Sequence, residues 1–189
     1  MFLFGMRQRR FKNKTESGKS PATRLTPEEI RARAFQRAVK LLAAKPRSVA
    51  ELRERLLERC SSKAIVETVI ARLREYGYLD DEKFALGYAS SKVRQQPIGR
   101  RRLEQNLAQK KVERAVADEA LDQVFAETSE EELINRAIEK RTRLRGKPQT
   151  RAEAKSLFDY LLRQGFPFDL VGDKVRAASR AELDEDNPS

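Results

Sequence analysis

The residues of this chain that could do chemistry are mostly basic, and they are densest between Lys92 and Arg114. That stretch holds eight lysine or arginine residues against two acids, Glu104 and Glu113. Three of its arginines, at positions 100–102, stand at the predicted start of a helix, which already carries partial positive charge. We therefore predict that an anionic partner, either phosphate or a carboxylate patch, contacts this segment. The candidate contact residues are Lys92, Arg94, Arg100, Arg101, Arg102, Lys110 and Lys111.

A solvated basic face is the alternative interpretation of this cluster. We favour contact because the segment is the most basic part of the predicted folded body. A second basic run, from Lys140 to Arg151, lies mostly at the predicted C-terminal end of a helix, where cations are stabilising without any partner. We therefore assign no site to the second run.

Aromatic residues alternate with charged residues near position 80; the aromatic residues are Tyr76, Tyr78, Phe84 and Tyr88. Aromatic rings beside cations can stack on nucleic-acid bases. The helical spacing of these residues beside apolar leucines favours packing between neighbouring structural units instead. We predict packing for this group.

The sequence has few of the residue patterns that catalysis, phosphate-binding loops or metal sites require. The chain has no histidine and one cysteine, Cys60, which excludes Ser-His-Asp and Cys-His catalysis and histidine-containing zinc sites. Its eight glycines form no phosphate-binding loop. The acidic groups Asp80/Asp81 and Glu130–Glu132 stand at predicted helix starts, where the helix dipole accounts for them. We expect no enzyme activity, no cofactor and no metal site.

Composition narrows the class of partner and the compartment. The net charge is +11 and the sequence pI is about 10.0, which points towards a polyanion, with nucleic acid as the default. With 37% charged residues and a mean hydropathy of −0.72, little apolar material is left for one thick core. A single cysteine indicates a reducing compartment. The sequence has no run of about 18 apolar residues, so we predict no membrane span.

The elements that must position the basic residues form a repeat. Leu52-x3-Leu56, Leu103-x3-Leu107 and Leu157-x3-Leu161 are spaced by 51 and 54 residues, and each lies in a short basic helical pattern followed by a break and another helix. A period this long predicts a unit of about three helices used three times. Such units are too small to bury a good core alone, so neighbouring units must stack. The predicted fold is all-α, an elongated array of three tandem three-helix repeats.

Composition shifts divide the chain into five parts. Residues 1–24 carry seven basic residues and one acid without helical periodicity, which predicts a disordered basic arm that either touches phosphates or only aids solubility. The three repeats are predicted at 25–79, 80–127 and 128–179, and 180–189 form an acidic C-terminal tail.

Helix boundaries are signalled by capping residues. Thr26/Glu29, Ser48/Glu51 and Thr150/Glu153 each have the spacing of a capping box. Gly77 and Gly165 each follow a helical pattern and suit the left-handed residue that ends a helix.

The boundary between the first two repeats reads Leu73-Arg-Glu-Tyr76-Gly77-Tyr78-Leu79-Asp80-Asp81-Glu82-Lys83-Phe84-Ala85. This segment resembles the RecX family of regulatory proteins. The second repeat of that family is similar to the pattern Tyr88…Lys92-Val-Arg94…Gly99-Arg100-Arg101…Leu103…Leu107-x3-Lys111-Val112. Its third repeat is similar to Leu161-Leu162-Arg163-Gln164-Gly165-Phe166. The resemblance covers about Phe35 to Val175. Cys60 and Lys111 depart from the pattern, because the family usually has a glycine at those helix ends.

The resemblance implies a bacterial cytoplasmic protein that binds the RecA recombinase, chiefly as its filament on single- or double-stranded DNA. Such a protein would lie in the filament groove and restrain ATP hydrolysis, strand exchange and coprotease activity, within DNA repair and the SOS response. We expect a monomer that contacts no membrane. Two other classes stay open: a direct DNA- or RNA-binding protein of helix-turn-helix type, favoured by salt-sensitive binding to naked DNA, and a helical scaffold for another protein.

Overall fold

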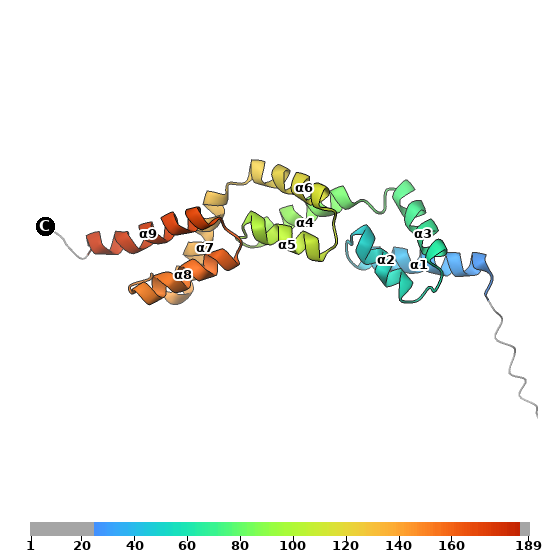
Figure 1. Ribbon diagram of the computed structural model, residues 1–189, viewed down its shortest axis with the longest axis horizontal. Coiled ribbons are helices and arrows are strands. Elements are labelled where there is room, and N and C mark those ends of the chain that lie inside the picture. Colours follow the sequence, from blue (N-terminus) through green and yellow to red (C-terminus); the bar gives the residue numbers. More distant parts are fainter. Residues whose placement is uncertain (1–24, 186–189) are drawn as a thin grey trace, which may run out of the picture.

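The computed structural model describes residues 25–185, with side chains described to Ser179, and this part of the chain contains nine α-helices and no strand. The helices follow one another along an elongated molecule, with α1–α3 at one end, α4–α6 in the middle and α7–α9 at the other end (Figure 1). They are α1 (Pro27–Ala44), α2 (Val49–Leu57), α3 (Lys63–Glu75), α4 (Asp81–Gln95), α5 (Arg100–Gln109), α6 (Arg114–Glu127), α7 (Glu130–Arg145), α8 (Arg151–Arg163) and α9 (Phe168–Glu185). The predicted all-α array of three-helix repeats is confirmed.

The two ends of the chain differ in how far the structure tests them. Helix α9 continues to Glu185, beyond the predicted limit of the third repeat at residue 179, because no breaking residue interrupts the sequence there. The predicted basic arm at 1–24 and the last residues, 186–189, lie outside the described part of the chain. Within 25–185, no helix has the length and apolarity needed to cross a bilayer.

Two of the three predicted capping boxes form completely. The Thr26 and Thr150 hydroxyls accept from the N–H groups of Glu29 and Glu153, whose carboxylates bond back to the cap backbones. At α2 the prediction is half wrong. The Ser48 hydroxyl accepts from the Glu51 N–H, but the Glu51 carboxylate bonds elsewhere.

Three helices end in the same way. After α3, α5 and α8, the residue in the left-handed region is Gly77 at φ 69°, Lys111 at φ 57° and Gly165 at φ 90°. The following N–H groups bond back to carbonyls of the last helical turn, as in Tyr78 to Leu73 at 2.9 Å. Lys111 thus takes the conformation that glycine adopts freely, at a cost of about 1–2 kcal/mol. Cys60 has no positive φ, so α2 ends without a left-handed residue.

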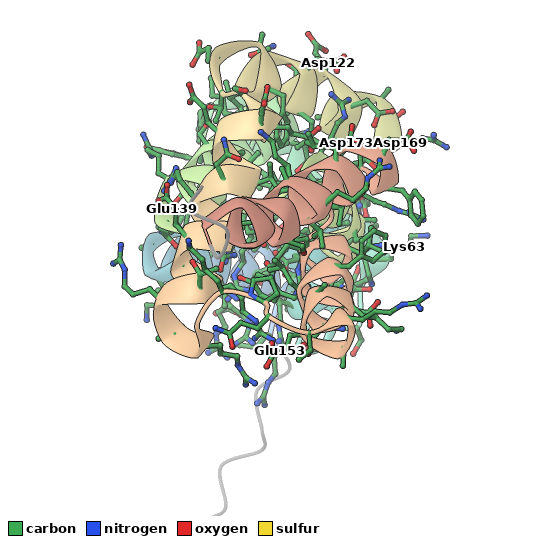
Figure 2. All side chains as sticks on the ribbon, turned by 90° about the vertical axis from the view of Figure 1, so that its left-hand side faces the viewer. Lys63, Asp122, Glu139, Glu153, Asp169 and Asp173 are labelled. Atoms are coloured by element: carbon green, nitrogen blue, oxygen red, sulfur yellow. The ribbon has the colours of Figure 1, made fainter. Side chains whose placement is uncertain are left out.

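Among residues 25–179, the buried apolar side chains form two clusters rather than three. One lies wholly within the first repeat and extends from Ala34 to Leu79. The other runs without interruption through the second and third repeats, from Phe84 to Val175. Viewed along the length of the array, charged side chains such as Lys63, Asp122 and Glu139 lie around its outside (Figure 2).

The second helices of the three repeats meet end to end. The backbone N–H of Gly99, the N-cap of α5, donates to the carbonyl of Gln164, the C-cap of α8, at 2.9 Å. The hydroxyl of Ser48, the N-cap of α2, donates to the carbonyl of Lys110, the C-cap of α5. Helices α8, α5 and α2 therefore form one row, which can be followed along the long axis in Figure 1.

Candidate partner-contact surface on the middle repeat

The predicted contact residues lie on the end of α4, on α5 and in the turn after α5. Helix α5 is anchored by Leu103 and Leu107, whose side chains are fully buried. These leucines recur every four residues, so they fix the inner face of the helix and leave the residues between them to face other surroundings. Gly99 supplies no side-chain cap for α5.

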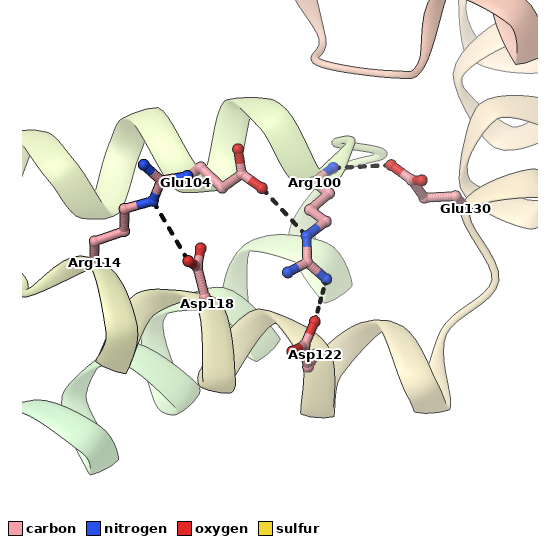
Figure 3. Close-up of polar contacts among 6 residues, drawn as sticks. All are labelled: Arg100, Glu104, Arg114, Asp118, Asp122 and Glu130. Carbon is pink, nitrogen blue, oxygen red and sulfur yellow. Dashed lines mark hydrogen bonds and ion pairs between the residues drawn. The ribbon is translucent and has the colours of Figure 1, made fainter.

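Arg100 is held within the protein by three acids. Its Nε donates to Glu104 on α5 at 3.2 Å, and its Nη1 donates to Asp122 on α6 at 2.6 Å. Its backbone N–H donates to the Glu130 carboxylate at 3.0 Å, which places a negative charge at the start of α5 (Figure 3). Burial lowers the pKa of Arg100, but the hydrogen bonds to Asp122 and Glu104 outweigh it, so the pKa is raised above its ordinary value.

This arrangement corrects part of the sequence argument. We expected the positive start of α5 to need an anionic partner, and for Arg100 that reasoning is wrong, because acids of the same chain already compensate its charge. The acids that compensate it lie 22 and 30 residues further along the chain, at Asp122 and Glu130. Arg114, also basic and close in sequence, pairs with Asp118 one turn along α6 at 3.6 Å (Figure 3). Arg100 is therefore first of all a structural residue that ties α5 to α6 and α7.

Three further residues of the cluster contact neighbouring repeats. The Nη1 of Arg102 donates to the backbone carbonyl of Arg163 in the third repeat at 2.5 Å. Lys110 Nζ donates to the Glu51 carboxylate at 3.0 Å, and Lys111 pairs with Glu54, both on α2. Local sequence could not reveal these pairs, because their members lie 57 to 61 residues apart.

Three residues of the cluster remain free of ion pairs within the described part of the chain. Arg94 and Arg101 are exposed, and neither has a hydrogen bond or ion pair to a described residue. Lys92 is half-buried, with its Nζ 5.6 Å from the centre of the Tyr88 ring. The part of the predicted cluster that is open to an outside anion is therefore Lys92, Arg94 and Arg101.

The second basic run lies around a cavity of about 280 Å³ between the end of α7 and α8. Arg141 lines this cavity, donates from Nη2 to the Ser156 hydroxyl at 3.2 Å and lies over the ring of Tyr160 at 5.1 Å. Arg141 thus helps to pack α7 against α8. Arg143 and Arg145 lie in the last turn of α7, where the helix dipole favours cations.

The four aromatic residues near position 80 divide into two pairs. Phe84 is buried and stacks on the half-buried Tyr88 of the same helix, with ring centroids 6.0 Å apart, and both pack against the cluster of the second and third repeats rather than against the first repeat. Tyr76 and Tyr78 are exposed, at 52% and 66%. The predicted packing between repeats is wrong for Tyr76 and Tyr78, because both rings are exposed and the Tyr76 ring meets Phe35 of its own repeat.

Among residues 25–185, no group of three or more histidine, cysteine or acidic residues is arranged to hold a metal ion. Cys60 is buried, and its Sγ lies 3.6 Å from the carbonyl of Ser62. The surface described above therefore presents charge and hydrogen-bond donors rather than metal ligands.

Comparison with known proteins gives a consistent result. Residues 34–73 match the first three-helix domain of RecX, and residues 80–121 match its second three-helix domain. The chain is 30% identical over 173 residues to the regulatory protein RecX of Thermobifida fusca (strain YX), an alignment that covers 89% of this chain and 91% of the relative. It is 38% identical over 113 residues to the regulatory protein RecX of Treponema pallidum (strain Nichols), covering 60% of this chain and 69% of that one.

Solved structures show the same fold. The crystal structure of RecX from Lactobacillus salivarius superimposes with a TM-score of 0.70 at 18% identity, covering 82% of this chain and 99% of that chain. A second crystal structure, of a regulatory protein RecX, superimposes with a TM-score of 0.67 at 23% identity.

Proposed function

Because this chain belongs to the RecX family of regulatory proteins, we propose that it binds the filament of the RecA recombinase on DNA and restrains the activities of that filament. The activities concerned are ATP hydrolysis, strand exchange and the coprotease function. The chain acts without chemistry of its own, as a bacterial cytoplasmic regulator that binds through its surface and carries no cofactor. It works as a monomer.

The observation that supports a contact site on the middle repeat is the pair of unpaired arginines, Arg94 and Arg101. Both are exposed, and neither has an internal partner among the described residues. A nucleoprotein filament offers phosphates and carboxylates, to which guanidinium groups bond in a bidentate manner. Lys92 lies two residues before Arg94 on α4, so its side chain faces another side of the helix and lies against the Tyr88 ring, and it is the weaker candidate of the three.

The remaining residues of the predicted cluster have a different part in this proposal. Arg100, Arg102, Lys110 and Lys111 hold helices and repeats in place, so they act on the partner chiefly by setting the shape of the array. Their reversal would change fold and binding together. The sharpest test therefore leaves them intact.

The test is a titration of RecA ATPase activity on single-stranded DNA with the wild-type chain and an Arg94→Glu/Arg101→Glu variant. Exposed charge contacts contribute about 0.2–1 kcal/mol each, and reversal adds repulsion, so inhibition should weaken about tenfold. Added salt should weaken the wild type more steeply than the variant, because fewer counterions are released when two contacts are lost.

A matched control reverses two exposed cations outside the cluster, Arg136 and Arg143 of α7, which also have no partner among the described residues. This control should inhibit RecA nearly as well as the wild type. Equal inhibition by the Arg94/Arg101 variant and the wild type would show that the cluster is only a solvated face. A wild-type chain without any effect on RecA would contradict the proposed function itself.

A further inference from the structure

Two tyrosines at the end of α3 are exposed where the same helix-end motif elsewhere buries its side chain. Tyr78 follows the left-handed Gly77, and the equivalent residues after α5 and α8 are Val112 and Phe166. Val112 is 7% exposed and Phe166 is 2% exposed, whereas Tyr78 is 66% exposed. The motif therefore does not require an aromatic ring in solvent, and the exposure of Tyr78 has another cause.

The rings are held in a defined arrangement. The Tyr76 and Tyr78 rings meet edge to face, with centroids 6.1 Å apart and planes at 78°. Tyr76 also meets the ring of Phe35 on α1 edge to face, with centroids 6.5 Å apart. The Phe35 contact supports Tyr76 from the side of the fold, and Tyr78 lies outermost.

A cation is built into the same group. The Arg72 guanidinium lies 5.2 Å from the centre of the Phe35 ring and 5.3 Å from that of Tyr76, and its Nε donates to the Tyr76 hydroxyl at 3.0 Å. Arg72 has no carboxylate partner in the described part of the chain. The next arginine, Arg74, is exposed and also has no described partner.

We propose that Tyr76 and Tyr78 stack on bases of single-stranded DNA, while Arg72 and Arg74 contact the adjacent phosphates. Every base presents a flat face that stacks on an aromatic ring whatever the sequence, and cations beside the rings attract the backbone. A duplex hides those faces between its base pairs, so the site takes single strands. The inference rests on the part of the proposed function that brings DNA to this chain, and it does not require RecA.

The test measures binding of the full-length chain to a fluorescein-labelled oligothymidylate by fluorescence anisotropy, without RecA. Stacking contributes about 1–3 kcal/mol per base, so Tyr78→Ala should weaken binding about 5- to 150-fold. Tyr76→Ala should act in the same direction. Tyr78→Ala is the cleaner variant, because its ring has little packing to lose and the fold should be unchanged by circular dichroism.

Two comparisons separate stacking from charge. Tyr78→Phe keeps the ring and should bind like the wild type. Tyr78→Ala should leave the slope of affinity against salt concentration unchanged, whereas Arg74→Ala should lower the slope by about one counterion. The matched control is Phe168→Ala, which removes a ring of the same 66% exposure on the third repeat and should leave binding unchanged.

The proposal is overturned if Tyr78→Ala binds the oligothymidylate as tightly as the wild type. It is equally overturned if Tyr78→Ala weakens binding to a duplex by the same factor, or if the wild type does not bind the single strand. A protein-binding role for the two tyrosines would appear as unchanged binding to the oligothymidylate with weakened inhibition of RecA. Since the assay contains no RecA, its failure is distinct from a failure of the proposed function.

Discussion

The junction between the first and second repeats is polar, whereas the junction between the second and third adds a shared apolar cluster to its hydrogen bonds and brings backbone against backbone. At the first junction, Ser48 bonds to the Lys110 carbonyl, Lys110 pairs with Glu51, and the Val49 N–H donates to Asp81 at 2.9 Å. The first repeat also has an apolar cluster of its own. Each of these contacts involves hydrogen bonds or charges that water can replace.

At the second junction, Gly99 and Gly165 meet so closely that neither tolerates a side chain. A Cβ on Gly99 would lie 2.4 Å from the Gly165 carbonyl, and a Cβ on Gly165 would lie 2.4 Å from the Arg102 nitrogen. One apolar cluster passes through both repeats. The difference between the junctions means that the second and third repeats form one block, and the first repeat is attached to that block through polar contacts.

The largest expected effect comes from Gly165→Ala. The residue has φ 90° and a neighbouring backbone in the way, so left-handed strain of about 1–2 kcal/mol adds to overpacking of about 1–3 kcal/mol. We expect about 2–5 kcal/mol lower stability, measured by urea unfolding followed by far-ultraviolet circular dichroism.

The matched control for Gly165→Ala is Gly77→Ala, near the first junction. Gly77 also has a positive φ, 69°, but a Cβ there meets nothing within 4 Å. Gly77→Ala should therefore show only the strain of about 1–2 kcal/mol. Equal losses in the two variants would contradict the claim that backbone contact stiffens the second junction.

A smaller effect should follow from Lys110→Ala at the first junction. Glu51 would lose its partner while half-buried, and its Oε2 already has no hydrogen bond to a described residue. An unsatisfied polar group of this kind costs about 1–3 kcal/mol. We expect the first repeat to separate from the block while staying folded, seen as a larger radius of gyration in small-angle scattering.

The neighbouring lysine provides the control for Lys110→Ala. Lys111 pairs with Glu54, but both side chains are more than half exposed, so Lys111→Ala should change the first junction by at most about 1 kcal/mol. Scattering from Lys110→Ala that matches the wild type would show that the polar contacts do not hold the first repeat in place.

The smallest expected effect is a loss of stability at low pH. Asp80 caps α4, and backbone hydrogen bonding from Lys83 lowers its pKa below the ordinary value. A lowered carboxyl pKa stabilises the fold above the ordinary pKa, and this stabilisation is lost as the pH falls through the folded value. The corresponding cap of α7 is Ser129, which does not titrate. The Asp80 cap of α4 should therefore weaken as the pH falls below the ordinary aspartate pKa, whereas the Ser129 cap of α7 should not change.

The acid effect can be tested with Asp80→Asn, since asparagine caps nearly as well as aspartate. Urea unfolding at neutral pH should give similar stabilities for the two proteins, and the difference should change in favour of the variant as the pH is lowered. A parallel loss of stability in both proteins at every pH would remove Asp80 as the cause.

The sequence was sufficient for most of the fold because its signals are local. The Leu-x3-Leu spacing, the Thr26 and Thr150 capping boxes and the left-handed Gly77 and Gly165 all act within a few residues. The Ser48/Glu51 box shows where such reasoning ends. Its spacing is correct, but the Glu51 carboxylate is taken by Lys110, which lies 59 residues away. No local pattern distinguishes a glutamate that completes its capping box from one that pairs with a distant lysine.

The candidate site was predictable as a region but not residue by residue. Charge density located the cluster, yet whether a cation is free depends on acids that folding brings close. Arg100 and Arg101 are adjacent in the sequence, and only Arg100 meets Asp122. Likewise, sequence spacing could not show that Tyr78 stays exposed while Phe166, at the same place in its motif, is buried.

The row of second helices gives the molecule a direction. Helix α8 ends where α5 begins, and α5 ends where α2 begins, so opposite partial charges meet at both junctions. The charges left over are a partial positive charge at the start of α8 and a partial negative charge at the end of α2. A nucleic-acid strand also has a direction, because its two ends differ chemically. In the proposed complex on DNA, the two ways of laying this array along the strand are therefore distinct and unequal in energy, and all bound molecules are expected to face the same way.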